Sequence, residues 1–79
     1  LAMNLLAAVP GRRYMIVKIR DAGVRQQADC LGMGEGEDVY CCARRGNGPV
    51  IIGRAGQMVA VGVEVARGIQ ILPSRPRKG

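Results

Sequence analysis

The stretch Val24-Arg-Gln-Gln-Ala-Asp-Cys-Leu-Gly-Met-Gly-Glu-Gly36 decides how this 79-residue chain divides into elements. Val24, Ala28 and Leu31 fall at i, i+4 and i+7, which predicts one amphipathic helix of about two turns over residues 24–31. Gly32 stands where a left-handed residue commonly ends a helix. The remainder of the stretch, with two further glycines, predicts a surface turn.

Outside this stretch the apolar residues alternate, which indicates strands. In Arg13-Tyr-Met-Ile-Val-Lys-Ile19, for example, Met15, Val17 and Ile19 form an apolar face. Strands are predicted over residues 13–19, 38–44, 49–53, 57–61 and 69–72, with a helical turn or edge segment at 5–9 and a helical turn at 62–66. Glycine pairs between the strands supply hairpin turns. The pattern predicts a mainly β fold, a small antiparallel β-barrel with one short α-helix, closed so that no sheet edge is exposed.

The chain length allows one domain, which we expect to span residues 3–72 and to begin naturally at Met3. Residues 73–79 contain two prolines, three basic residues and no apolar anchor, which predicts a disordered basic tail. Subtracting those three charges from the net charge of +6 leaves +3, an ordinary value for a small folded domain.

Three observations predict a cytoplasmic protein. No apolar run approaches the roughly 18–20 residues that a membrane span requires. No charged and then apolar leader precedes the domain. The three cysteines, an odd number, do not form a disulfide framework and agree with a reducing compartment.

The sequence offers no residues suited to catalysis, and we predict that the protein is not an enzyme. It has no histidine, which is the commonest general base and the commonest transition-metal ligand. Glu35, Glu37 and Asp38 are close in sequence, but they flank glycines in a predicted turn. We expect a solvated acidic turn there, because nothing apolar is near enough to make an acid–base pair.

The cysteines are the remaining candidates for a metal site. Cys41 and Cys42 are adjacent on a predicted strand, so their side chains should point to opposite faces and not share one ion. They also lack the two-residue spacer of structural zinc sites. Cys30, near the end of the predicted helix, could approach a strand cysteine in space. We predict no metal site and no cofactor, with a metal-sensing module as one alternative.

Two basic pairs raise a second alternative, a nucleic-acid-binding barrel. Arg12-Arg13 and Arg44-Arg45 could meet across neighbouring strands. Small barrels that bind nucleic acid usually combine such charge with stacking aromatic residues, and only Tyr14 and Tyr40 are available here. We therefore expect a solvated basic face.

Four motifs follow one another in a suggestive order: Leu31-Gly-Met-Gly-Glu-Gly-Glu-Asp-Val39 after the short helix, Gly48-Pro-Val-Ile-Ile, Gly56-Gln-Met-Val-Ala-Val-Gly62, and Ala66-Arg-Gly-Ile-Gln-Ile71. In this order and spacing the chain resembles the FeoA family of bacterial ferrous-iron transport accessory proteins. The likeness runs from about Leu5 to Leu72. Ala28 is a departure, since the family commonly has a larger apolar residue at that position.

The resemblance implies an SH3-like barrel and a cytosolic accessory to the membrane iron permease FeoB, which carries its own GTP-binding domain. The same barrel forms the C-terminal domain of iron-dependent repressors of the DtxR type. Because the chain lacks their DNA-binding and dimerisation segments, we expect a free-standing module. It would bind the permease through an apolar-rimmed surface. We expect Met33, held out on the glycine turn, at that surface; the alternative is that Met33 folds back on the core.

Overall fold

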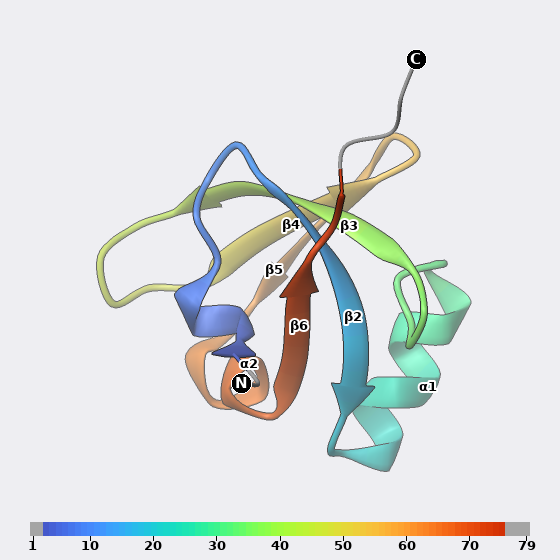
Figure 1. Cartoon of the computed structure of the whole chain (residues 1–79). Helices are drawn as coiled ribbons and strands as arrows, with labels where there is room; N and C mark the ends of the chain where they lie inside the picture. The colour runs from blue at the N-terminus through green and yellow to red at the C-terminus, as the bar shows by residue number, and fades with distance from the viewer. Residues whose placement is uncertain (1–2, 76–79) are drawn as a thin grey trace.

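The computed structural model describes residues 3–75, which form a strongly curved sheet with two short α-helices at its margins (Figure 1). In chain order the elements are β1 (Met3–Asn4), the 3₁₀-helix η1 (Leu5–Ala7), β2 (Arg13–Ile19), α1 (Ala22–Cys30), β3 (Asp38–Arg44), β4 (Val50–Arg54), β5 (Gln57–Val61), α2 (Val63–Arg67) and β6 (Ile69–Pro73). Every predicted strand is present to within one residue at each end. Neither α-helix of this described part is long and apolar enough to cross a membrane.

All neighbouring strands are antiparallel, in the order β1-β6-β2-β3-β4-β5. The last strand in the sequence therefore lies between the first two, as Figure 1 shows. Within residues 3–75, β1 pairs only with β6 and β5 only with β4, so the ladder of strands does not close. The prediction of a mainly β, SH3-like fold with one short helix is confirmed, whereas the expectation of a sheet without an exposed edge is wrong.

A β-bulge in β2 decides which of its side chains reach the core. The pairing of β2 with β6 changes register directly after Ile16. Tyr14, Ile16 and Ile19 are buried, whereas Met15 and Val17 are exposed. The predicted apolar face is therefore wrong for Met15 and Val17, because simple alternation does not allow for the extra residue of a bulge.

The core is built from apolar side chains of strands β2 to β6, of η1 and α2, and of the segments that follow η1 and α1. Its members are Leu5, Ala8, Tyr14, Ile16, Ile19, Met33, Val39, Cys41, Val50, Ile52, Val61, Ala66, Ile69 and Ile71. Tyr14 is the one aromatic residue among them, and its hydroxyl accepts a 2.8 Å hydrogen bond from the amide of Val9. This bond gives the buried phenol oxygen a partner and ties the loop between η1 and β2 to the core.

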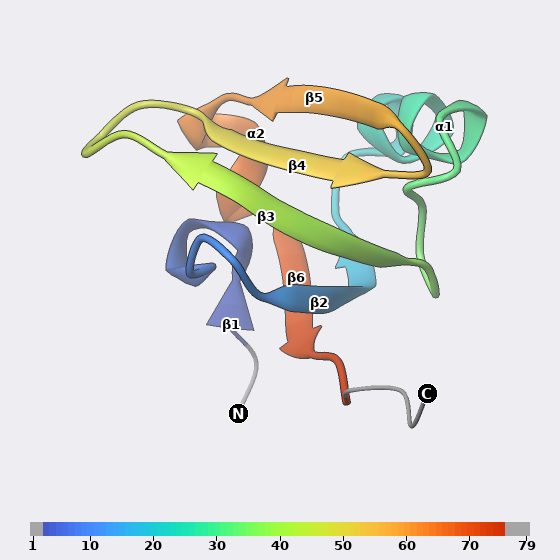
Figure 2. The same ribbon diagram turned by 90° about the horizontal axis from the view of Figure 1, so that it is seen from above.

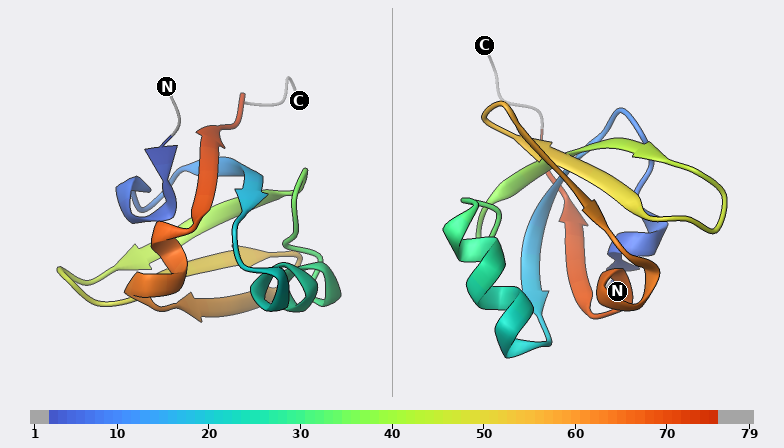
Figure 3. Two further views of the ribbon diagram at one scale, coloured as in Figure 1. Left: turned by 90° about the horizontal axis from the view of Figure 1, so that it is seen from below. Right: turned by 180° about the vertical axis from the view of Figure 1, so that it is seen from behind.

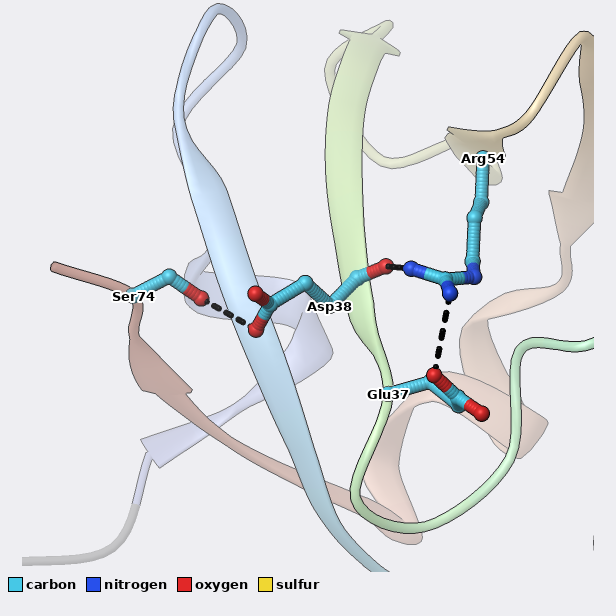
Figure 4. Close-up of polar contacts among 4 residues, drawn as sticks. All are labelled: Glu37, Asp38, Arg54 and Ser74. Atoms are coloured by element: carbon cyan, nitrogen blue, oxygen red, sulfur yellow. Dashed lines mark hydrogen bonds and ion pairs between the residues drawn. The ribbon is translucent and has the colours of Figure 1, made fainter. Parts of the chain in front are cut away.

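Polar contacts fasten the end of β6 to the β3–β4 side of the sheet (Figure 4). The hydroxyl of Ser74 donates to the Asp38 carboxylate at 2.7 Å. The Asp38 carbonyl accepts a 3.1 Å hydrogen bond from Arg54, whose guanidinium also pairs with Glu37 at 3.1 Å. Ser74, in the predicted tail, is thus held by Asp38, and residues 76–79 of that tail lie outside the described residues.

Candidate partner-binding groove

Helix α1 stands beside the sheet instead of packing flat against it. It begins at Ala22, because the Asp21 carboxylate caps it by accepting a 2.9 Å hydrogen bond from the amide of Val24. None of its residues is fully buried, and Val24 and Ala28 are half-buried against the core. The helix predicted over residues 24–31 is confirmed, with a start two residues earlier.

The way in which α1 ends directs the side chain of Met33 into the core. Gly32 has a φ of 72°, and its amide donates to the carbonyl of Asp29 at 3.1 Å. The amide of Met33 donates to the carbonyl of Ala28 at 2.9 Å. This is a Schellman motif, in which the residue after the left-handed glycine packs against the helix. Met33 is only 3% exposed, so the expectation that it lies on the surface is wrong and the alternative, that it folds back on the core, holds.

An apolar groove of about 180 Å³ opens between α1, β5 and α2. Figure 2 places α1 and α2 near opposite ends of β5, and the view from behind in Figure 3 shows the same three elements around the open side of the curved sheet. The core residues Ile16, Ile19, Met33, Ile52 and Ile69 form its floor, and the walls carry Val24, Ala28, Leu31, Val59, Ala60, Val61 and Val65. Met33 thus lies beneath the groove and not on its rim.

Apolar side chains remain exposed around the rim of this groove. Leu31 at the end of α1 is 38% exposed, and Val65 in α2 is 39% exposed. Ala28 lies on the same wall as Leu31, and its small side chain fills little of the space. Contiguous apolar surface that opens onto a hollow is typical of a binding site.

The surface becomes cationic next to the start of α1 and the end of α2. A hollow that shares three lining residues with the groove leads to a second hollow, whose cationic lining is Lys18, Arg20, Arg25 and Arg67. The nearby carboxylates are engaged, since Asp21 caps α1 and Glu64 pairs with Arg67. Within residues 3–75, Lys18 and Arg20 have no ion-pair partner. The cationic hollow therefore lies beyond one end of the apolar groove, past a hollow that Asp21 and Glu64 also line.

The acidic turn before β3 has a structural role. Glu35 accepts a 2.9 Å hydrogen bond from the amide of Ile19. Glu37 pairs with Arg54, and the Asp38 carboxylate accepts a hydrogen bond from the Ser74 hydroxyl. The turn is accessible to solvent, as expected, with Glu35 exposed and Glu37 and Asp38 half-buried, but it also has a structural role. The three carboxylates hold three different partners and join the turn to β2, β4 and the end of β6.

The three cysteines differ in their surroundings. Cys41 is buried, Cys42 is half-buried and Cys30 is exposed at the end of α1. Burial raises the pKa of the Cys41 thiol, the neighbouring Cys42 raises it further, and Arg44 acts in the opposite direction. Among residues 3–75, no group of three or more His, Cys, Asp and Glu side chains is placed to hold a metal ion.

The two basic pairs do not meet across the sheet. Arg13 pairs with Tyr40 in the β2–β3 ladder, and Arg44 lies further along β3. Arg44 is half-buried and donates a hydrogen bond to the carbonyl of Leu6, whereas Arg45 is exposed. Arg12, Arg13 and Arg45 are exposed, in line with the expected solvated basic surface, but Arg44 is withdrawn from it and holds η1 against β3.

Sequence reasoning missed both the cationic end of the groove and the open edge of β5. The four basic residues come from β2, the turn after it, α1 and α2, so no local motif joins them. The sequence gives one signal for them: Lys18 and Arg20 directly precede and follow the buried Ile19, the last residue of β2. The open edge follows from strand pairing, which the alternation of residues does not reveal.

Comparison with known proteins identifies a matching family model and two similar structures. A family model described as the FeoA domain matches residues 3–73. A crystal structure of an iron uptake regulatory protein (FeoA) superposes with a TM-score of 0.78 at 23% identity, covering 94% of this chain and 100% of that chain. A manganese-dependent transcriptional repressor superposes with a TM-score of 0.76 at 21% identity, covering 92% of this chain but 42% of that chain. No curated protein sequence matches.

Proposed function

This chain belongs to the FeoA domain family, and from that premise we propose that it is a non-catalytic accessory module of bacterial ferrous iron uptake. It acts in the cytoplasm by binding the cytosolic region of a FeoB-type membrane permease. Ferrous iron is the cargo of that permease and not a ligand of this domain. The chemistry of the chain supports a binding role, since the sequence contains no histidine and the carboxylates before β3 are engaged with structural partners.

The apolar groove is the observation that carries this proposal. Its volume of about 180 Å³ is below the roughly 300–1,000 Å³ of small-molecule pockets. A space of this size suits one or a few apolar side chains from a partner protein. Burying the exposed rim residues Leu31 and Val65 against such a partner is favourable at about 25 cal/mol per Å² of apolar surface. We assign the groove as the surface that contacts the permease.

Replacing Leu31 by lysine tests this assignment. Leu31 is 38% exposed, so the domain should stay folded, and a cation at the C-terminus of α1 suits the helix dipole. In a complex, the ammonium group would be desolvated without a partner, which should weaken binding to the cytosolic region of the permease at least about tenfold. Isothermal titration calorimetry measures the affinity, and circular dichroism checks the fold.

Val17→Lys is the matched control. Val17 is similarly exposed, at 41%, but it lies on β2 outside the groove, so this variant should keep the wild-type affinity. Equal affinities for Leu31→Lys and wild type would exclude the groove as the contact surface. If the wild-type domain does not bind the permease but binds nucleic acid with a steep salt dependence, the nucleic-acid-binding function would be supported instead of the accessory function.

A further inference from the structure

The outer edge of β5 presents unpaired backbone groups. Strands β4 and β5 are joined by a two-residue turn, Ala55-Gly56, with φ values of 52° and 83°. In such a hairpin the residues flanking the turn form a hydrogen-bonded pair, and bonded and non-bonded pairs alternate from there. The N–H and C=O groups of Met58 and Ala60 therefore point away from β4. No backbone hydrogen bond within residues 3–75 reaches these groups from another element.

This edge lacks the devices that usually protect an exposed strand. Residues 57–61 contain no charged residue and no proline, and their pairing with β4 runs without a bulge. The opposite edge of the sheet, β1, is only two residues long. Strand β5 is thus the one long edge in the described chain that offers a template for another strand.

The same edge forms one wall of the apolar groove. Val59, Ala60 and Val61 line the groove on one side, and Val24 and Ala28 of α1 line it on the other. A strand added to β5 would turn every second side chain toward the floor of the groove, because side chains alternate along a strand. Backbone hydrogen bonds would then supply affinity, and the groove would select apolar side chains.

Charge complementarity identifies the end of such a strand. Beyond Val65, the groove leads through a hollow lined by Arg20, Arg67, Asp21 and Glu64 to the cationic hollow, where Lys18 and Arg20 have no ion-pair partner among the described residues. A carboxylate placed there would gain two nearby positive charges, and an apolar or basic residue would not. The occupant should therefore carry acidic residues at the end that approaches α2.

We propose that the groove takes an extended segment of the partner protein, which adds to β5 as a further antiparallel or parallel strand. The segment has apolar residues at alternate positions and a carboxylate at the end beside Arg20. This inference rests on the proposed binding of the permease and specifies how that binding occurs.

Ala60→Pro tests the strand addition directly. Proline removes the outward N–H of residue 60 and leaves the bonds between β4 and β5 intact, so the fold should survive at this edge position. Binding to the cytosolic region of the permease should weaken about tenfold, because at least one intermolecular backbone bond is lost. Ala60→Val changes the same groove residue but keeps the N–H and favours a strand, so it should bind more tightly than Ala60→Pro.

Amide hydrogen exchange of the wild-type complex supplies a readout that needs no substitution. The amides of Met58 and Ala60 should exchange rapidly in the free domain and at least about tenfold more slowly in the complex. Arg20→Glu should weaken binding several-fold at low salt, and this loss should shrink in high salt as screening increases.

The outcomes separate this inference from the function on which it rests. If Leu31→Lys weakens binding while Ala60→Pro binds like wild type and the two amides stay unprotected, the groove binds the permease without strand addition, and the inference is overturned. If the wild-type domain does not bind the permease at all, the proposed function fails and the inference falls with it. Weaker binding by Ala60→Pro than by Ala60→Val, with protection of the two amides in the complex, supports the inference.

Discussion

The amide of Met33 donates a 2.9 Å hydrogen bond to the carbonyl of Ala28, one turn back in α1. This bond closes the end of the helix and aims the Met33 side chain at the core beneath the groove. Ala28 at the same time forms part of the groove wall. The bond therefore couples the floor of the candidate binding site to the helix that forms its side.

Met33→Asp should strongly destabilise the protein. A carboxylate at a position with 3% exposure would be buried without a partner, which costs about 3 kcal/mol or more. A small domain has only about 5–15 kcal/mol of stability to lose. Met33→Leu, which keeps the volume and polarity, should cost less than about 1.5 kcal/mol. Urea denaturation followed by circular dichroism compares the two, and a stable Met33→Asp domain would contradict the buried position of Met33.

Gly32→Ala should destabilise the domain through the backbone alone. Gly32 has a φ of 72°, and an added Cβ would meet no atom within 4 Å. The left-handed conformation costs a non-glycine residue about 1–2 kcal/mol. Gly62→Ala is the matched control, because its added Cβ also meets nothing while its φ of −62° is ordinary, and it should change stability by less than about 0.5 kcal/mol. Equal midpoints of thermal unfolding for both variants would argue against the left-handed cap.

Arg44→Ala and Arg45→Ala should differ although the residues are neighbours. Arg44 is half-buried and donates to the carbonyl of Leu6, so its loss removes a charged hydrogen bond worth about 1.5 kcal/mol. Arg45 is exposed, and its replacement should be nearly neutral. Denaturant titration of both variants checks this difference. Loss of stability from Arg45→Ala alone would reverse the roles given to the two arginines.

Cys41 should make the protein less stable in alkaline solution. Burial raises the pKa of its thiol above the ordinary value of 9.0, so the unfolded chain releases this proton at a lower pH than the folded one. Above that ordinary value the unfolded state binds fewer protons. The free energy of unfolding therefore falls as pH rises toward the folded pKa, by at most about 1.4 kcal/mol per pH unit from this group.

Denaturation between about pH 8 and pH 10 measures this slope. Cys41→Ala should flatten it, apart from the contribution of other groups that titrate in the same range. A slope that survives in Cys41→Ala would assign the alkaline loss to another group.

The strands and α1 could be predicted because their signals are local. Alternation and the spacing of Val24, Ala28 and Leu31 report on neighbouring residues, and the turns contain the glycines that their backbones require. The bulge in β2 was not predictable from alternation, because the extra residue is defined only by the pairing with β6. The burial of Met33 did carry a signal, an apolar residue directly after the helix-ending Gly32, which is the usual Schellman pattern.

The candidate site was less predictable than the fold. The groove wall on α1 follows from the spacing of Val24, Ala28 and Leu31. The distance between α1 and β5, however, depends on the curvature of the whole sheet. The cationic end draws on residues as far apart as Lys18 and Arg67. Such a cluster exists only after β6 has brought α2 beside the end of β2, so no window of the sequence contains it.

The position of β6 between β1 and β2 also limits when the domain can mature during protein synthesis. The hairpins formed by β3, β4 and β5 join neighbours in sequence and can assemble as soon as they leave the ribosome. Strands β1 and β2, although made first, must wait for Ile69 and Ile71 to emerge before their shared core is sealed. A nascent chain arrested before that point would expose the unpaired edges of β1 and β2 and should be more sensitive to proteases than the complete domain.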